Sequence, residues 1–553
     1  MSPRLRLLAA VSCLALAAGP AFAAKSHGDV DARLKALEDA LASQQAQMVR
    51  QEQTIEAQQA EIQRLKQEVG ETTAAAQQAP VAQAVQAQQS QIATLQDNAE
   101  QQKLADRERP RVTYPVGRPT LTSPDGRYTI ALRALVQADA GHYSQAAQGP
   151  PATDFRRGSQ GATANRETNA AGDLSDGAYF RRARLGIEGT FNRDWGYRFV
   201  AEFAGSGAEG PARINDAWIS YTGFAPFTVQ AGAFSPPANM DDGTAPDDTL
   251  FVERASASEL SRTLGGADGR LGIALKAATA RWMGSVTFTS RTVNDAEVND
   301  SQAAVVARFG HLLATSDDYN IHIGANGTYV FSPADQGLPT TPRYAIRLRE
   351  RPEFRLDSTR LIDTGSIDAA HAYNAGLEFG AQYRNLYVQG ETLWFGIERR
   401  APTALSDPTF FGFYLQGSWV LTGEPHRYNM ATGSFQSPRP YAPITSSGGL
   451  GAWELAVRYS DIDLNYHEGV ALAATPADGV RGGEQKIWSV GLNWYPNANL
   501  RVMLGYLHID VSRLNPAGPG NLTPFGAAPA TPPIGVQIGQ TAHMIAVRTQ
   551  FGF

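Results

Sequence analysis

The chain of 553 residues contains a single cysteine, Cys13, inside an apolar stretch near its first residue. The remainder therefore offers no thiol for a disulfide, a metal site or a nucleophile. No stretch approaches about 18 uninterrupted apolar residues, which excludes a membrane protein built from spanning helices. Lysine is also scarce, because Lys276 and Lys486 are the only lysines after residue 110.

The first 23 residues have the pattern of a secretory signal peptide. Two arginines precede an apolar run over residues 7–18, and the small-residue site Ala21-Phe22-Ala23 follows. We expect cleavage after Ala23 and export from the cytoplasm. A lipoprotein signal is the alternative interpretation of Cys13, but apolar residues continue well beyond it.

Residues 24–110 are rich in alanine and glutamine, and their apolar residues recur with a helical period. A strict seven-residue spacing predicts a left-handed coiled coil. At about 1.5 Å per residue, the first repeat would form a rod of roughly 50 Å. A partly helical, glutamine-rich linker is the alternative. The first repeat consists of Leu34, Leu41, Met48, Ile55, Ile62 and Val69, and a weaker one follows Pro80 at Val81, Val85, Gln88, Ile92 and Leu95.

From residue 111 onward the period changes to two, which is typical of strands with one apolar and one polar face. In residues 128–138, for example, Ile130 and Leu132 share one face, and Arg133 and Gln137 share the other. Such strands form membrane barrels whose apolar face meets lipid. The expected strands are 128–138, 179–191, 194–205, 212–222, 226–235, a hairpin over 271–289, 302–314, 318–331, 370–383, 385–397, 410–422, 450–463, 485–496, 498–510 and 541–553.

The links between these segments are alternately short and long, as in a barrel with turns at one rim and loops at the other. The link over residues 423–449 is long where a turn is due, so the strand order stays open there. The last segment alternates up to Phe553, an ending that the barrel-assembly machinery of outer membranes recognises. We therefore expect residues 111–553 to form an all-β outer-membrane barrel of about 16 antiparallel strands.

Basic residues on the polar strand faces predict a lumen that attracts anions. Guanidinium groups keep their charge and offer forked donors, which suits phosphate. Rows of such groups would steer an anion and release it again. Bracing of the barrel wall is the alternative role for these residues. Strand alternation places Arg133, Arg182, Arg184, Arg198, Arg270 and Lys276 in the lumen.

The long link over residues 236–268 carries both basic and acidic residues. It contributes Arg254 and Arg262 to the candidate anion contacts, but it also holds Asp241-Asp242 and Asp247-Asp248. This mixture of basic and acidic residues argues against a constriction lined by charges of one sign only. Paired aspartates could bind a divalent cation, but solvated acidic loops are commoner, so we expect no metal and no cofactor.

Several blocks of sequence between about Tyr128 and Phe553 share a pattern with one known family. They are Tyr179-Phe-Arg-Arg-Ala-Arg-Leu-Gly-Ile-Glu-Gly189, Asp216-Ala-Trp-Ile, Gly232-Ala-Phe-Ser-Pro-Pro, Phe251-Val-Glu-Arg254, Arg351-Pro-Glu, Asp363-Thr-Gly365, Leu421-Thr-Gly-Glu424, Trp453-Glu-Leu-Ala-Val-Arg-Tyr459 and Gly491-Leu-Asn-Trp-Tyr-Pro496. In these blocks the chain resembles the phosphate-selective porin O/P family. The resemblance implies a homotrimer of sixteen-stranded barrels through which anions, phosphate or polyphosphate among them, diffuse passively. It also implies that the third long loop, residues 236–268, folds inward as the constriction.

The charge composition of this chain differs from that of the family, whose channel entrance is rich in lysine. Residues from 111 onward contain 37 lysines and arginines against 41 aspartates and glutamates. The sequence therefore leaves two alternatives. One is a general, weakly selective porin, and the other is a tether that joins the outer membrane to peptidoglycan through the coiled coil. We expect no enzyme, because no G-x-S-x-G, G-x-x-x-x-G-K-[ST] or H-E-x-x-H motif occurs. We expect lipid and small anions as partners, and no nucleic acid.

Overall fold

A computed structural model of the chain describes residues 78–145, 174–204, 212–295, 299–340, 342–357, 359–400, 405–516 and 534–553. The expected signal peptide and the first heptad repeat lie outside these ranges. The chain divides into two compact units, and one of them comprises Val112–Ile444 and Leu450–Phe553.

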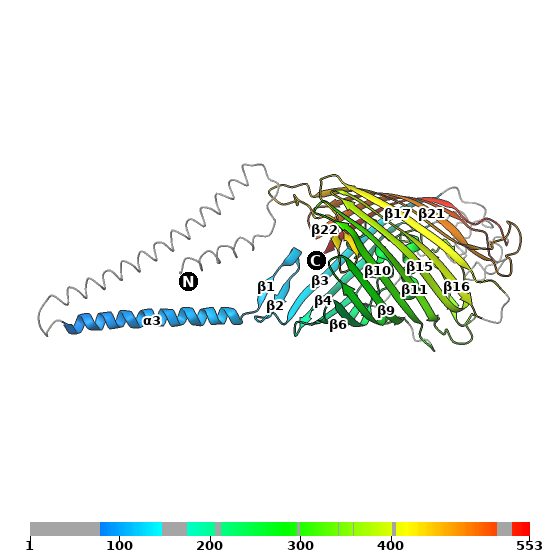
Figure 1. Cartoon of the computed structure of the whole chain (residues 1–553). Coiled ribbons are helices and arrows are strands. Elements are labelled where there is room, and N and C mark those ends of the chain that lie inside the picture. The colour runs from blue at the N-terminus through cyan, green and yellow to red at the C-terminus, as the bar shows by residue number, and fades with distance from the viewer. Residues whose placement is uncertain are drawn as a thin grey trace, which may run out of the picture. The chain divides into compact units, whose positions relative to one another are not determined.

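Sixteen antiparallel strands of this unit form a closed barrel (Figure 1). Each strand pairs with the next along the chain, and the last pairs with the first, which closes the sheet. The predicted strand count is confirmed. The strands are β3 (Thr129–Gln145), β4 (Gly177–Phe191), β5 (Trp195–Glu202), β6 (Arg213–Phe224), β7 (Phe227–Phe234), β8 (Arg270–Ala278), β9 (Trp282–Thr292), β10 (Ala303–Thr315), β11 (Tyr319–Ser332), β15 (Ile367–Tyr383), β16 (Leu386–Arg399), β17 (Thr409–Val420), β20 (Ala452–Tyr466), β21 (Val480–Tyr495), β22 (Leu500–Ser512) and β23 (Thr541–Gly552).

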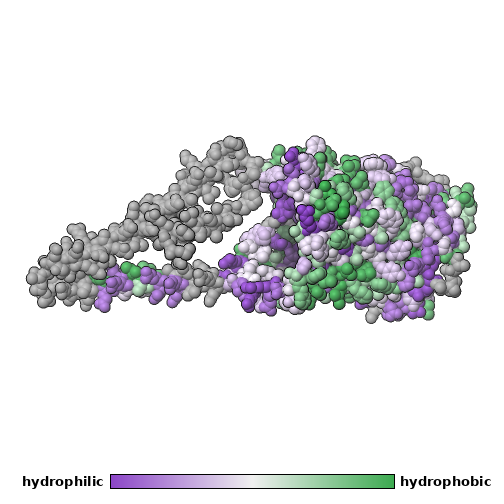
Figure 2. Space-filling model, viewed as in Figure 1, coloured by the Kyte–Doolittle hydropathy of each residue, from purple (hydrophilic) through white to green (hydrophobic). Residues whose placement is uncertain are grey.

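The alternation along each strand sorts side chains between lipid and lumen. In β23, Met544 and Ala546 are buried inside, whereas Ile545 and Val547 are exposed on the outside. Figure 2 shows hydrophobic residues gathered over the outer wall of the barrel, with hydrophilic residues toward its ends. This arrangement is the one that lets a barrel lie in a bilayer while its lumen stays polar.

The strand links meet at two rims. At the short-turn rim, β4 and β5 are joined by a tight hairpin in which Asn192 and Arg193 both have positive φ. The long-loop rim carries the links after β3, β7, β11 and β22. The long link over residues 421–451, which left the strand order open, belongs to the short-turn rim. Its neighbours β17 and β20 pair directly, so the order is unbroken.

The link over residues 421–451 is long because it folds into the lumen instead of spanning the rim. It contains a small hairpin of β18 (Arg427–Asn429) and β19 (Ser434–Gln436). We call this the lower hairpin. The aromatic ring of Phe435 is buried among Met240, Leu250 and Tyr387, which come from a loop and from the barrel wall.

Two loops from the opposite rim also fold inward. Residues 235–269, the inward loop, join β7 to β8 and contain α5 (Met240–Gly243) and α6 (Ser256–Gly265). Residues 333–366 join β11 to β15 and contain the short strands β12 (Ala345–Ile346), β13 (Arg349–Glu350) and β14 (Ile362–Asp363). Leu260 of α6 and Phe354 of the second loop belong to one buried apolar cluster inside the barrel.

The N-terminal part of the described chain contains one long helix, α3 (Gln78–Glu108), with Pro80 in its first turn where a proline is tolerated. Ile92 and Leu95 of the weaker predicted repeat are exposed on it. Before β3 come β1 (Arg111–Thr113), the 3₁₀ turn η1 (Pro115–Gly117) and β2 (Thr120–Thr122), and β2 pairs with β3. None of the described helices is long and apolar enough to cross a membrane.

Candidate permeation path

Three cavities with shared lining residues follow one another through the lumen. The long-loop cavity, of about 280 Å³, is lined by Arg182, Arg184 and α6. The middle cavity, of about 210 Å³, shares Arg184 with it and lies against the inward loop. The short-turn cavity, of about 270 Å³, shares Arg133 with the middle one. Shared lining residues make the three cavities one candidate path.

The inward loop is fixed by arginines from the opposite wall, which bind its backbone. Arg501 on β22 donates to the carbonyl oxygens of Thr249 and Leu250 at 2.7 and 3.3 Å. Arg458 on β20 donates to the carbonyl of Glu253 at 3.0 Å, and Arg548 on β23 donates to the carbonyl of Val252. These donors satisfy carbonyl groups that no strand or helix pairs, so the loop keeps one conformation.

The tip of the loop is held in a similar way. Asn239 accepts a hydrogen bond from the backbone N–H of Asp242 and caps α5. The Glu391 carboxylate on β16 accepts from the backbone N–H of Met240 at 2.6 Å. The lower hairpin meets the loop where Ser434 donates to the carbonyl of Gly243 at 3.0 Å. The barrel wall and the lower hairpin thus both hold the tip of the inward loop.

A β-bulge in β4 places two successive arginines inside the barrel. Gln137 pairs with Arg182 while Ala138 pairs with Phe180, so Arg181 is the extra residue. The alternation predicted Arg182 inside, but it gave no sign of Arg181. Arg181 forms a two-pronged ion pair with Glu253 of the inward loop, at 2.5 and 3.1 Å.

Arg182 is buried and has no carboxylate partner among the described residues. It is 4% exposed, and its Nη1 atom donates to Gln137 Oε1 at 2.6 Å. Within the part of the chain that the structure describes, its Nε atom is buried and has no hydrogen-bond partner. An unpaired buried cation is costly, so this guanidinium is a strong candidate for binding an anion from the long-loop cavity.

Two other predicted wall arginines share one carboxylate. Arg133 and Arg198 both donate to Glu188, at 2.9 Å each, and Arg198 also lies over the ring of Trp218. Arg118, from the segment before β2, contacts the other oxygen of Glu188. Three guanidinium groups on one carboxylate leave a local excess of positive charge beside the middle and short-turn cavities.

Five predicted residues act largely within the protein scaffold. Arg184 bonds to Glu202 and to Asp268, although it still lines two cavities. Arg262 of α6 is bound by three carboxylates, and the one from Asp242 lies at 2.6 Å.

Arg254 donates to the carbonyls of Asp241 and Thr244, both at 3.0 Å, and lines the middle cavity. Arg270 and Lys276 line none of the three lumenal cavities. Arg270 donates to two backbone carbonyls, and Lys276 donates to Gln230 at 2.8 Å.

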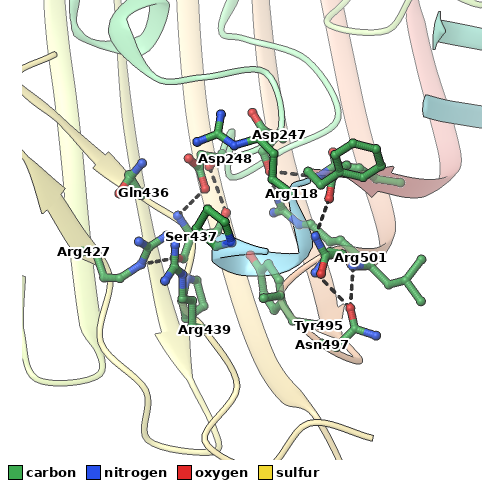
Figure 3. Close-up of a pocket in the computed structure, with 18 of the residues that line it drawn as sticks. Arg118, Asp247, Asp248, Arg427, Gln436, Ser437, Arg439, Tyr495, Asn497 and Arg501 are labelled. Carbon is green, nitrogen blue, oxygen red and sulfur yellow. Dashed lines mark hydrogen bonds between the residues drawn. The ribbon is translucent and has the colours of Figure 1, made fainter. Parts of the chain in front are cut away.

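The short-turn cavity collects arginines that the sequence analysis did not select. Figure 3 shows Arg427 and Arg439 on one side of it, Arg118 and Arg501 on the other, and two aspartates above. Arg501 lies on the lumen face of its strand by the alternation of the sequence, so the sequence alone could have identified it. The other three arginines lie in links outside the barrel strands. Links lack the two-residue alternation that tells lumen-facing from lipid-facing residues.

The two aspartates of this cavity belong to the inward loop. The Asp248 carboxylate accepts from the backbone N–H of Ser437 at 2.9 Å. Burial raises the pKa of Asp248 to about 6, and the neighbouring carboxylate of Asp247 adds to the shift. Among the described residues, no group of three or more carboxylate, histidine or cysteine side chains could hold a metal ion.

The sequence matches the family model of the phosphate-selective porins O and P over residues 153–521. The chain belongs to this family. Porin O of Pseudomonas aeruginosa is 26% identical over 367 residues, which cover 62% of this chain and 79% of that protein. An uncharacterized protein of Caulobacter vibrioides is 27% identical over 474 residues, which cover 79% of this chain and 87% of that protein. The chain is therefore an outer-membrane porin. This confirms the predicted family, the predicted location in the outer membrane and the prediction of a channel.

Among solved structures, an anion-selective porin from Comamonas acidovorans has 10% sequence identity and a TM-score of 0.41. The match covers 77% of this chain and all of that one. The barrel assignment rests on the strand pairing described above, not on this distant likeness.

Proposed function

We propose that this porin is a passive channel that favours anions, with phosphate and polyphosphate as its physiological solutes. The observation that carries the proposal is Arg182, a buried guanidinium in the lumen whose Nε atom has no partner among the described residues. Phosphate oxygens are the acceptors that such a group binds best, since the charge is permanent and the donors are forked.

The charges around Arg182 fit this role. The long-loop cavity is lined by Arg181, Arg182, Arg184, Arg213, Arg262, Arg355 and Arg360, against Glu202, Glu259, Asp268, Asp295 and Glu350. The short-turn cavity is lined by Arg118, Arg133, Arg427, Arg439 and Arg501, against Asp247 and Asp248. Positive charge at both ends of the path would draw an anion in and give it a second site on the way out.

A weakly selective porin is the second candidate, and the pairing of Arg184 and Arg262 with carboxylates favours it. An arginine that is paired with a carboxylate contributes little to the electrostatic field in the lumen. The two candidates differ in what Arg182 does, because a general porin needs no unpaired cation beside the long-loop cavity.

The proposal includes the organisation of the whole chain. We assign residues 1–23 to a cleaved signal, 24–110 to a coiled-coil stalk and 111–553 to the barrel, assembled as a homotrimer with the inward loop as constriction. Ile92 and Leu95 are exposed on α3. A single long helix is marginal alone, so partner helices or peptidoglycan would cover these side chains. The strand that ends at Phe553 would engage the barrel-assembly machinery.

Reversal potentials in planar bilayers under a salt gradient test the proposal. We expect anion selectivity in the native channel and a marked loss of it in Arg182→Gln. Arg127→Gln is the matched control, because Arg127 is exposed in a turn and pairs only loosely with Asp125. Equal reversal potentials in all three proteins, after the variants are shown to be folded, would favour the general porin.

A further inference from the structure

The middle cavity is lined by both signs of charge, and the charges left unpaired there are negative. Arg184 and Arg198 each have a carboxylate within 3.0 Å. Asp216 and Asp247 also line this cavity. Within the described chain, neither has a cationic partner within 4.0 Å, and Asp216 accepts only from the Asn215 amide at 2.9 Å.

The two carboxylates come from different sides of the path. Asp216 lies on β6, opposite Val200 of β5, and so belongs to the barrel wall. Asp247 lies in the inward loop, where its backbone carbonyl accepts from Gln550 at 3.0 Å. Its side chain forms no ion pair within the described part of the chain. A solute in the middle cavity therefore meets carboxylates on two sides, close to the guanidinium groups of the wall.

This arrangement is more favourable for a solute that carries both signs than for a pure anion. A phosphate group next to Arg182 would gain from that guanidinium, but two free carboxylates farther along would repel it. An ammonium group on the same solute would turn that repulsion into attraction. The cavity, of about 210 Å³, is smaller than sites for drug-sized ligands, so the solute must be small.

We propose that the preferred solutes are small zwitterionic phosphate esters, in which Asp216 and Asp247 bind the ammonium group and guanidinium groups bind the phosphate. This inference rests on the proposed anion function and narrows its substrate class. The carboxylates would act as specificity residues in the middle of the path.

Block of chloride current in planar bilayers by three probes tests the inference. The probes are inorganic phosphate, glycerol 3-phosphate and phosphoethanolamine, of which only the last has an ammonium group. Because one partly exposed charge pair contributes up to about 1 kcal/mol, we expect phosphoethanolamine to block at about two- to fivefold lower concentration than glycerol 3-phosphate. In Asp216→Asn with Asp247→Asn, the two esters should block equally.

The control variant is Asp318→Asn, which removes an exposed carboxylate at the short-turn rim and should keep the preference. Single variants Asp216→Asn and Asp247→Asn keep the test usable if the double variant does not fold. Equal block by the two esters in the native channel would overturn the inference while block by inorganic phosphate still supported the proposed function. A preference that survives both substitutions would overturn it as well. No block by any probe would refute the proposed function itself.

Discussion

Arg548 on the last strand forms a two-pronged ion pair with Asp139 on the first strand, at 2.6 and 2.7 Å, across the seam where the barrel closes. Both side chains are fully buried. The same guanidinium donates to the carbonyl of Val252 in the inward loop. One side chain therefore joins closure of the barrel to the position of the loop that borders the path.

Substitution of one partner of this ion pair should destabilise the barrel strongly. In Arg548→Met, the Asp139 carboxylate is left buried without a cation, which costs about 3–5 kcal/mol in comparable proteins. Urea unfolding of the porin in lipid vesicles measures the change. Arg384→Met, at an exposed turn pair with Asp318, should change the free energy of unfolding by less than about 1 kcal/mol. Equal effects of the two substitutions would contradict the importance of the seam.

The lower hairpin should stiffen the inward loop through Phe435. Truncation in Phe435→Ala removes a buried ring that packs on Met240 and Leu250, a change that costs about 3–5 kcal/mol in well-packed cores. Since the strand pairing is untouched, we expect higher single-channel conductance and more current noise in a barrel that stays closed. Phe551→Ala, on the outer wall, is the control and should leave the current unchanged. Native conductance in Phe435→Ala would show that the hairpin does not support the loop.

The pH dependence of selectivity should reflect Asp248. Burial and the Asp247 carboxylate raise its pKa to about 6, while Arg427 and Arg501 act in the opposite direction. Above that pH the group is ionised, and below it the group is neutral. Lowering the pH from about 7.5 to about 5 therefore removes negative charge from the short-turn cavity, and anion selectivity should rise. Reversal potentials at both pH values measure this. A change of the same size in Asp248→Asn would assign the effect to another group.

The barrel was predictable from the sequence because lipid and lumen impose opposite polarity on alternate residues. The expected strand over residues 541–553 is found as β23 (Thr541–Gly552), and the remaining expected strands have counterparts in the structure. The bulge at Arg181 escaped prediction, since an extra residue changes the alternation without any sign in composition. The inward course of residues 421–451 escaped it too, because link residues carry no period.

The candidate path was predictable only in part. Alternation placed Arg182 in the interior, but whether a guanidinium is free or paired depends on groups that other segments supply. Arg262, for example, is bound by Asp242, Glu259 and Asp268, and all three come from its own loop. Among the residues that the structure describes, Arg182 has only Gln137 as a hydrogen-bond partner. That difference is set by tertiary packing, which residue spacing does not encode.

The most direct test of the anion channel is titration of chloride current with inorganic phosphate across single channels in planar bilayers. The structure predicts saturable block in the native porin. Loss of a charge-assisted hydrogen bond should weaken that block about tenfold or more in Arg182→Gln, with partial recovery in Arg182→Lys. Absence of block in the native channel, or equal block in a folded Arg182→Gln channel, would contradict a phosphate site at Arg182.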